Sequence, residues 1–131
     1  MTVLIGYVPT AVGEAALAAG LAEASARGDD VVVFNSPRRG STVDANLISA
    51  DASAQLLATA SAAGVEARID QTDHGADIVD AFSSAVESAG ARLVVIGLRR
   101  RSPVGKLMMG SDAQRLLLEL DAPILAVKPA R

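Results

Sequence analysis

The segment from Leu98 to Ser111 contains the residues best suited to bind an anion. Four cations lie within it: Arg99, Arg100, Arg101 and Lys106. It ends in Gly110-Ser111, directly before an apolar pattern of helical spacing. A helix N-terminus offers free N–H groups and the positive end of the helix dipole, and nearby cations add attraction for the same anion. This combination predicts a phosphate-binding site.

Two common nucleotide-binding motifs do not match this segment. Gly105-Lys106 resembles the end of a P-loop, but Arg100 stands where that motif needs its first glycine and Leu107 where it needs Ser or Thr. The Gly-x-Gly-x-x-Gly pattern of dinucleotide-binding folds is also absent. The predicted phosphate site is therefore neither a P-loop nor a Rossmann turn.

Other candidate chemistry is weaker. The single histidine, His74, lies among aspartates at the start of a predicted helix, where acidic residues favour the helix dipole, so no metal site is predicted. The sequence places no histidine base near Ser61, Ser83 or Ser84 that could activate a serine nucleophile, and the chain has no cysteine nucleophile. We expect no catalytic residues and no enzymatic turnover, apart from weak hydrolysis of a bound nucleotide.

The elements that must position the phosphate site alternate along the chain. Five short apolar runs predict strands at residues 3–5, 31–34, 65–69, 93–96 and 124–127. Alanine-rich stretches between them predict helices from Thr10 to Gly28, from about 43 to 63, from about 76 to 89, and from Ser111 to about Leu120. The third run alternates polar and apolar residues, as an edge strand does. This order predicts an α/β fold in which helices cover both faces of an open parallel sheet.

In such sheets ligands bind at the carboxyl ends of the strands, where the strand order reverses. The first and fourth strands are the expected neighbours there. Their carboxyl ends lead into Gly6-Tyr7-Val8-Pro9-Thr10 and into Gly97 with the basic segment that follows it.

Length and composition limit the remaining possibilities. The 131 residues predict one domain spanning 1–131. Residues 92–131 have a formal charge of +5, against −8 for the first 91, but the chain as a whole is acidic and only 2% aromatic, which argues against nucleic-acid binding. No apolar run is long enough to span a membrane, and the lack of cysteine fits a cytoplasmic protein.

The segment after the fourth strand resembles the signature of the universal stress protein family, Gly-x2-Gly-x9-Gly-Ser/Thr. Gly97, Gly110 and Ser111 are in register with it, as is the last apolar run after Pro123. The opening residues 3–10 are similar to the family's Ile-Leu-Val-(Ala/Gly)-x-Asp-Gly-Ser. The resemblance covers the whole chain.

This resemblance implies a three-layer sandwich with four helices and a five-stranded sheet in the order 3-2-1-4-5. It also implies a stress-response regulatory module that binds ATP or AMP, and a homodimer paired through Ile124, Leu125, Ala126 and Val127. The nucleotide-binding candidates are Val8, Pro9, Thr10, Asn35, Gly97, Arg99, Arg100, Gly110, Ser111 and Asp112.

Two departures from the family pattern leave the function open. Val8 replaces the family aspartate and cannot hydrogen-bond through its side chain, and Arg100 replaces the second signature glycine. Arg100 blocks a backbone geometry that only glycine permits, but its guanidinium can bind phosphate. The alternative is a ligand-independent dimeric interaction protein with a degenerate pocket. A nucleotide hydrolase or transferase is the third class considered.

Overall fold

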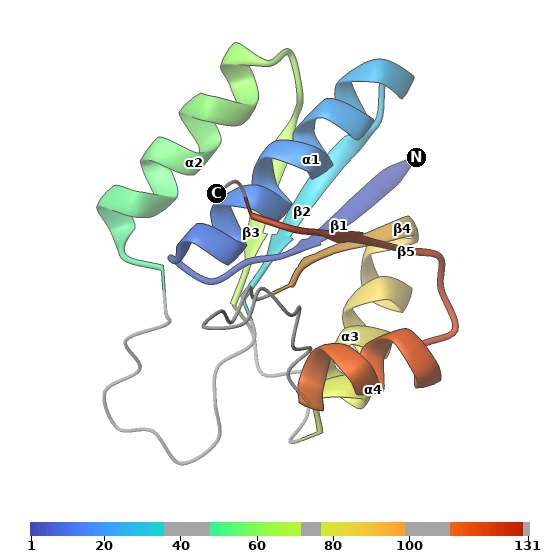
Figure 1. Cartoon of the computed structure of the whole chain (residues 1–131). Helices are drawn as coiled ribbons and strands as arrows, with labels where there is room; N and C mark the ends of the chain where they lie inside the picture. The colour runs from blue at the N-terminus through green and yellow to red at the C-terminus, as the bar shows by residue number, and fades with distance from the viewer. Residues whose placement is uncertain (36–47, 72–76, 99–110, 130–131) are drawn as a thin grey trace.

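The computed structural model describes residues 1–35, 48–71, 77–98 and 111–129. The strands are β1 (Thr2–Gly6), β2 (Asp30–Phe34), β3 (Ala67–Asp70), β4 (Ala91–Gly97) and β5 (Ile124–Val127). The helices are α1 (Ala11–Arg27), α2 (Ala50–Ala62), α3 (Ile78–Ala89) and α4 (Ser111–Glu119). The strands form one parallel sheet in the order β3-β2-β1-β4-β5, with α1 and α2 on one face and α3 and α4 on the other (Figure 1). The α/β class, the four helices and the strand order expected from the sequence are confirmed.

The core consists of two apolar layers, one on each face of the sheet. Val3, Ile5 and Val95 pack under α1 and α2, while Leu4 and Val94 pack under α3 and α4. These strand residues are 0% exposed. Successive side chains of a strand point to opposite faces of the sheet, and here both faces are covered by helices. Consecutive core residues of such a strand are therefore apolar, which explains the continuous apolar runs in the sequence.

Most element boundaries lie within two residues of the expected ones, and the start of the second helix differs most. The second helix begins at Ala50, later than the expected start near residue 43; residues 43–47 lie outside the described part of the chain. Ser49 is the N-cap, and its side chain accepts a hydrogen bond from Ala52 N at 3.1 Å. Ile48 lies before the helix, where its N–H donates to Gln71 Oε1 at 2.7 Å and its carbonyl accepts from Gln71 Nε2 at 3.2 Å. The third strand likewise begins at Ala67 instead of Val65.

The two edges of the sheet differ in charge. β3, at one edge, includes Arg68 and Asp70, and it has the edge position that its alternating pattern predicted. β5, at the other edge, has only Ile, Leu, Ala and Val, and Leu125 is 38% exposed. Charged residues on an edge strand discourage pairing with another sheet. Only β3 has that protection.

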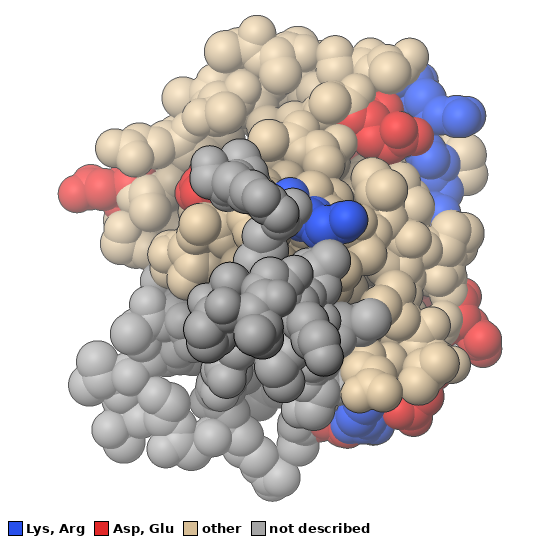
Figure 2. Space-filling view, viewed as in Figure 1, with Lys and Arg blue, Asp and Glu red and all other residues tan. Residues whose placement is uncertain are grey.

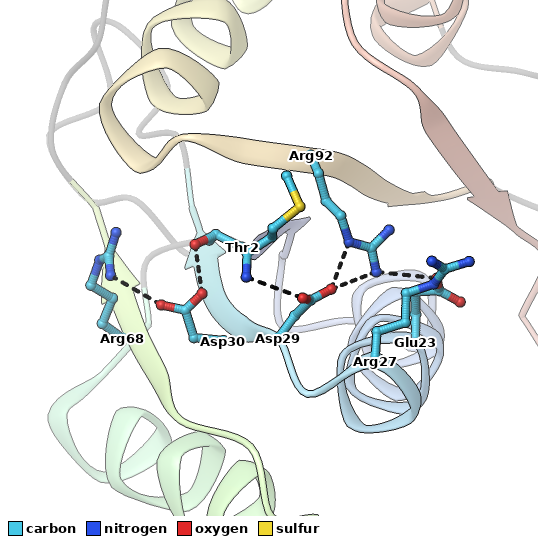
Figure 3. Close-up of polar contacts among 8 residues, drawn as sticks. Thr2, Glu23, Arg27, Asp29, Asp30, Arg68 and Arg92 are labelled. Atoms are coloured by element: carbon cyan, nitrogen blue, oxygen red, sulfur yellow. Dashed lines mark hydrogen bonds and ion pairs between the residues drawn. The ribbon is translucent and has the colours of Figure 1, made fainter.

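A polar network joins the amino ends of the strands (Figure 3). Arg92 is an extra residue at a register shift between β1 and β4, so it has no opposite residue in β1. Its Nε donates to Asp29 Oδ2 at 2.6 Å, and its Nη2 donates to Glu23 Oε1 at 3.2 Å. The Met1 amino group lies 3.2 Å from Asp29 Oδ1. The network thus ties β4 to α1 and to the turn before β2.

The Asp29 side chain is only 6% exposed, and two opposing effects act on it. Burial by itself raises the pKa of a carboxyl group. Hydrogen bonds from Arg92 and the Met1 amino group outweigh burial and lower the pKa of Asp29. Asp29 is therefore a buried carboxylate that stays ionised.

Within the described ranges, no helix is both long and apolar enough to cross a membrane.

Candidate functional site

The carboxyl ends of β1 and β4 lie next to each other at the centre of the sheet. Chain order reverses between these two strands, since β2 and β3 follow on one side and β5 on the other. Ile5 pairs with Val95 shortly before both strands end at Gly6 and Gly97. The position that sequence reasoning selected for a ligand is thus a topological switch point.

Asn35 holds the ends of three strands together at this edge. It follows β2, is 0% exposed, and donates through Nδ2 to the Tyr7 carbonyl oxygen at 2.8 Å. Its backbone N–H donates to Asp70 O at 2.9 Å, while Tyr7 N–H donates to Phe34 O at 2.9 Å. Asn35 was a candidate ligand residue, and these contacts give it a structural role at the rim of the site.

The link from β1 to α1 places Val8, Pro9 and Thr10 on the surface at the same edge. Thr10 is the N-cap of α1, and its Oγ1 accepts a hydrogen bond from Gly13 N–H at 3.3 Å. Val8 is 36% exposed and presents an apolar side chain there. Gly13 lies so close that an added Cβ would be 1.7 Å from Val8 O. The first turn of α1 therefore packs directly on the link that follows β1.

Gly97 is held equally close to α1. A Cβ at this position would lie 2.3 Å from Val12 O and 2.5 Å from Val12 Cγ1. Real Cβ atoms do not approach a carbonyl oxygen so closely, so only glycine fits without movement of α1 or β4. Close packing at the switch point thus requires a glycine here whether or not a ligand binds.

The remaining candidates belong to the start of α4 and the segment before it. Ser111 and Asp112 are the first two residues of α4, and Asp112 is exposed. Arg99, Arg100 and Gly110 lie outside the described residues, as does His74. The structure thus brings together the ends of β1, β2 and β4, and it starts α4 at the residue that the sequence indicated.

Sequence reasoning missed a hydrogen bond beside the site. The Tyr7 side chain is 5% exposed, and its hydroxyl donates to the Glu14 carboxylate in the first turn of α1. Burial, followed by this hydrogen bond and the charge of Glu14, raises the pKa of Tyr7 above its ordinary value. The hydroxyl stays protonated and serves as a donor that fixes α1 against β1.

A second missed contact joins α3 to α4. Asp77, the N-cap of α3, accepts hydrogen bonds from the guanidinium of Arg115 in α4. The acidic start of α3 was visible in the sequence, but its partner lies 38 residues away. A contact of that span has no local signal.

The described surface in the view of Figure 2 has no large area of a single charge. Uncharged side chains cover most of it, and acidic and basic groups adjoin at its upper right margin. No continuous basic surface crosses the described part of this face.

Comparison with known proteins places this geometry in a family. The sequence profile of the universal stress protein family matches residues 1–128. A universal stress protein of Mycolicibacterium smegmatis is 39% identical over 127 residues, which cover 97% of each chain. The chain belongs to the universal stress protein family.

Solved structures of universal stress proteins have the same fold. One from Archaeoglobus fulgidus superposes with a TM-score of 0.79 at 29% identity and covers 97% of both chains. A universal stress protein from the same organism, solved in complex with dAMP, has a TM-score of 0.73 at 24% identity. That pair covers 97% of this chain and 96% of the other.

Proposed function

We propose that this universal stress protein is a stress-response regulatory module that binds ATP or AMP at the carboxyl edge of β1 and β4. The observation that carries the proposal is the switch point itself, where β1 and β4 end side by side and α1 begins against both. Family membership supports it, and so does a structural relative solved with dAMP.

The phosphates would lie at the start of α4. The N–H groups of the first turn of α4 would supply donors, while Arg99, Arg100, Gly110 and the hydroxyl of Ser111 would complete the site on sequence grounds. The nucleoside would face the exposed link of Val8, Pro9 and Thr10. Val8 has no hydrogen-bonding group, so its side chain would provide apolar contact without reading the base.

Several polar groups at this edge already have structural partners, which favours binding over turnover. Thr10 caps α1, Asn35 holds the Tyr7 carbonyl, and the Tyr7 hydroxyl is bonded to Glu14. We propose a binding protein without catalytic residues.

The test is calorimetric titration of the protein with ATP, GTP and adenosine. We expect ATP and GTP to bind with similar, modest affinity, because Val8 cannot discriminate between bases, and adenosine to bind more weakly because it has no phosphate. Ser111→Ala should weaken ATP binding by about tenfold, the effect of one hydrogen bond to a charged group. Ser61→Ala, which removes an exposed hydroxyl near the far end of α2, is the control and should change nothing.

One result would refute nucleotide binding: no heat with ATP and no rise in melting temperature, although a ligand at about 100 times its Kd stabilises by about 2.7 kcal/mol. The second candidate, a ligand-independent dimeric interaction protein, would then remain. The uncharged edge strand β5 favours it, since Ile124, Leu125, Ala126 and Val127 offer a surface for pairing with a second copy.

A further inference from the structure

Arg115 in α4 uses its guanidinium to contact two carboxylates. Nη1 donates to Asp77 Oδ1, and Nη2 donates to Asp77 Oδ2 at 3.3 Å. Nε donates to Glu119 Oε2 at 3.0 Å, one turn further along the same helix. The two-pronged contact with Asp77 is the one that joins α4 to another element.

Asp77 is itself fixed in position. Its Oδ2 accepts hydrogen bonds from Val79 N at 3.1 Å and from Asp80 N at 3.2 Å, which cap α3. α3 in turn packs on the sheet through Val79 and Phe82. The Arg115–Asp77 pair therefore anchors α4, at a residue one turn after its start, to the N-cap of α3 at the carboxyl edge of the sheet.

The other contacts of α4 are less directional. Leu116 of α4 and Leu120, directly after the helix, are buried in the core. Apolar burial depends on area and hardly on angle, whereas a bidentate guanidinium–carboxylate pair has a fixed geometry. The ion pair is thus the contact best able to set the rotation and the axial position of α4. Ser111 lies one turn before Arg115, at the start of the same helix.

We propose that Arg115 is a positioning residue: through Asp77 it holds the first turn of α4 where that turn can bind phosphate. This inference rests on the proposed nucleotide site. It adds Arg115 and Asp77 as residues that shape the site without contacting the nucleotide. The side chains are partly exposed, 42% for Arg115 and 35% for Asp77, and ion pairs at such positions add little to stability. Their effect should appear in the geometry of α4.

Removing the charge of Asp77 distinguishes positioning of α4 from two other effects: repulsion of the anion by Asp77, and direct binding of phosphate by Arg115. A carboxylate near an anion site repels the anion, so its removal should strengthen phosphate binding if charge alone matters. Removal would also release Arg115 to bind phosphate directly, if that were its role. Positioning predicts weaker phosphate binding instead, because loss of the Asp77 charge loosens the first turn of α4.

The experiment uses the full chain with three substitutions. Asp77→Asn removes the charge but keeps the cap, since Asn and Asp cap helices equally well. Arg115→Gln removes the guanidinium. Glu119→Gln is the matched control, because it breaks the pair within α4 and leaves the contact with α3. ATP and adenosine affinities are measured by calorimetry, and amide exchange is measured without ligand at Arg115 and Leu116, whose N–H groups bond to the first turn of an α-helix.

We expect Asp77→Asn and Arg115→Gln each to lower ATP affinity about tenfold, as for one misaligned hydrogen bond to phosphate. The double variant should be no weaker than either single variant, because both act through one contact. Adenosine affinity should stay constant, and Glu119→Gln should match wild type. Exchange at Arg115 and Leu116 should accelerate in the first two variants only.

Two results would overturn the inference: unchanged or stronger ATP binding by Asp77→Asn, or equal exchange in all variants. The first result combined with weaker binding by Arg115→Gln would make Arg115 a direct ligand instead. If wild type binds no ATP, the proposed function fails, and the exchange measurement alone decides whether Asp77 and Arg115 position α4.

Discussion

At the scale of single residues, the glycines at the carboxyl edge are explained by contacts with the backbone of α1. Gly97 belongs to the family signature, which the resemblance associates with phosphate binding. An added Cβ there would collide with the carbonyl oxygen of Val12. Gly97 is therefore needed for packing, and its presence alone does not indicate that a nucleotide binds.

We predict that Gly97→Ala lowers the free energy of unfolding by about 1–3 kcal/mol, the usual cost of overpacking. Gly6→Ala is the matched comparison at the end of β1. Its Cβ would lie 2.9 Å from Phe82 Cζ, and an aromatic ring can shift more easily than a helix backbone. Urea unfolding should therefore show the larger loss for Gly97→Ala. Equal losses would contradict the assigned contact with Val12.

Residues with local partners could be predicted from the sequence, and residues with distant partners could not. Gly28 was expected to end α1, and it does so with φ at 70° and its N–H donating to Ala24 O. Helix caps bond within a few residues, so they leave a readable pattern. Tyr7–Glu14 and Asp77–Arg115 depend on how elements meet in space. The details of the site therefore needed the structure.

At the scale of elements, the network around Asp29 fastens α1, β2 and β4 at the end of the sheet opposite the candidate site. The pKa of Asp29 is held below the usual Asp value of about 3.9. A lowered carboxyl pKa stabilises the fold above the unfolded-state pKa, and this contribution disappears as the pH falls through the folded-state pKa. The network should therefore weaken in acid.

We predict that Asp29→Asn lowers the melting temperature near neutral pH, and that its difference from wild type shrinks as the pH drops below about 4. Thermal unfolding followed by circular dichroism across this range measures both effects. Asp121→Asn, an exposed aspartate after α4, is the control and should follow wild type throughout. A difference that is independent of pH would mean that Asp29 acts by packing instead of charge.

Element types and order followed from periodicity, but one helix start did not. The runs of apolar residues and the alanine-rich stretches gave all five strands and four helices. Just before the late start of α2, the side-chain amide of Gln71 bonds both backbone groups of Ile48. Residues 48 and 71 are far apart in sequence, so helix propensity could not reveal this boundary.

At the scale of the whole molecule, the two sheet edges predict how copies of the chain meet. β5 has no charged residue and an exposed Leu125, whereas β3 has Arg68 and Asp70. We expect a homodimer in which β5 pairs with β5 of a second copy. This pairing was expected from the sequence and remains a prediction.

Leu125→Lys should convert the dimer to monomer, because it places a charge on the pairing edge. Leu57→Lys is the matched control: Leu57 is 39% exposed, close to the 38% of Leu125, but it lies on α2, which packs near β3 at the opposite edge from β5. Light scattering at micromolar concentration distinguishes the outcomes. A monomeric wild type, or a monomeric Leu57→Lys variant, would count against pairing through β5.

The unequal edges also limit how large an assembly can become. Self-pairing about a two-fold axis uses the same surface on both copies, so the interface is closed and neither copy keeps an open β5. The outermost strands of the joined sheet are then the two β3 strands, with the charges of Arg68 and Asp70. A further copy that paired with either outer strand would have to approach these charges, which oppose the pairing. Raising the protein concentration should therefore fill one discrete species, and fibres built by edge-to-edge growth should not form.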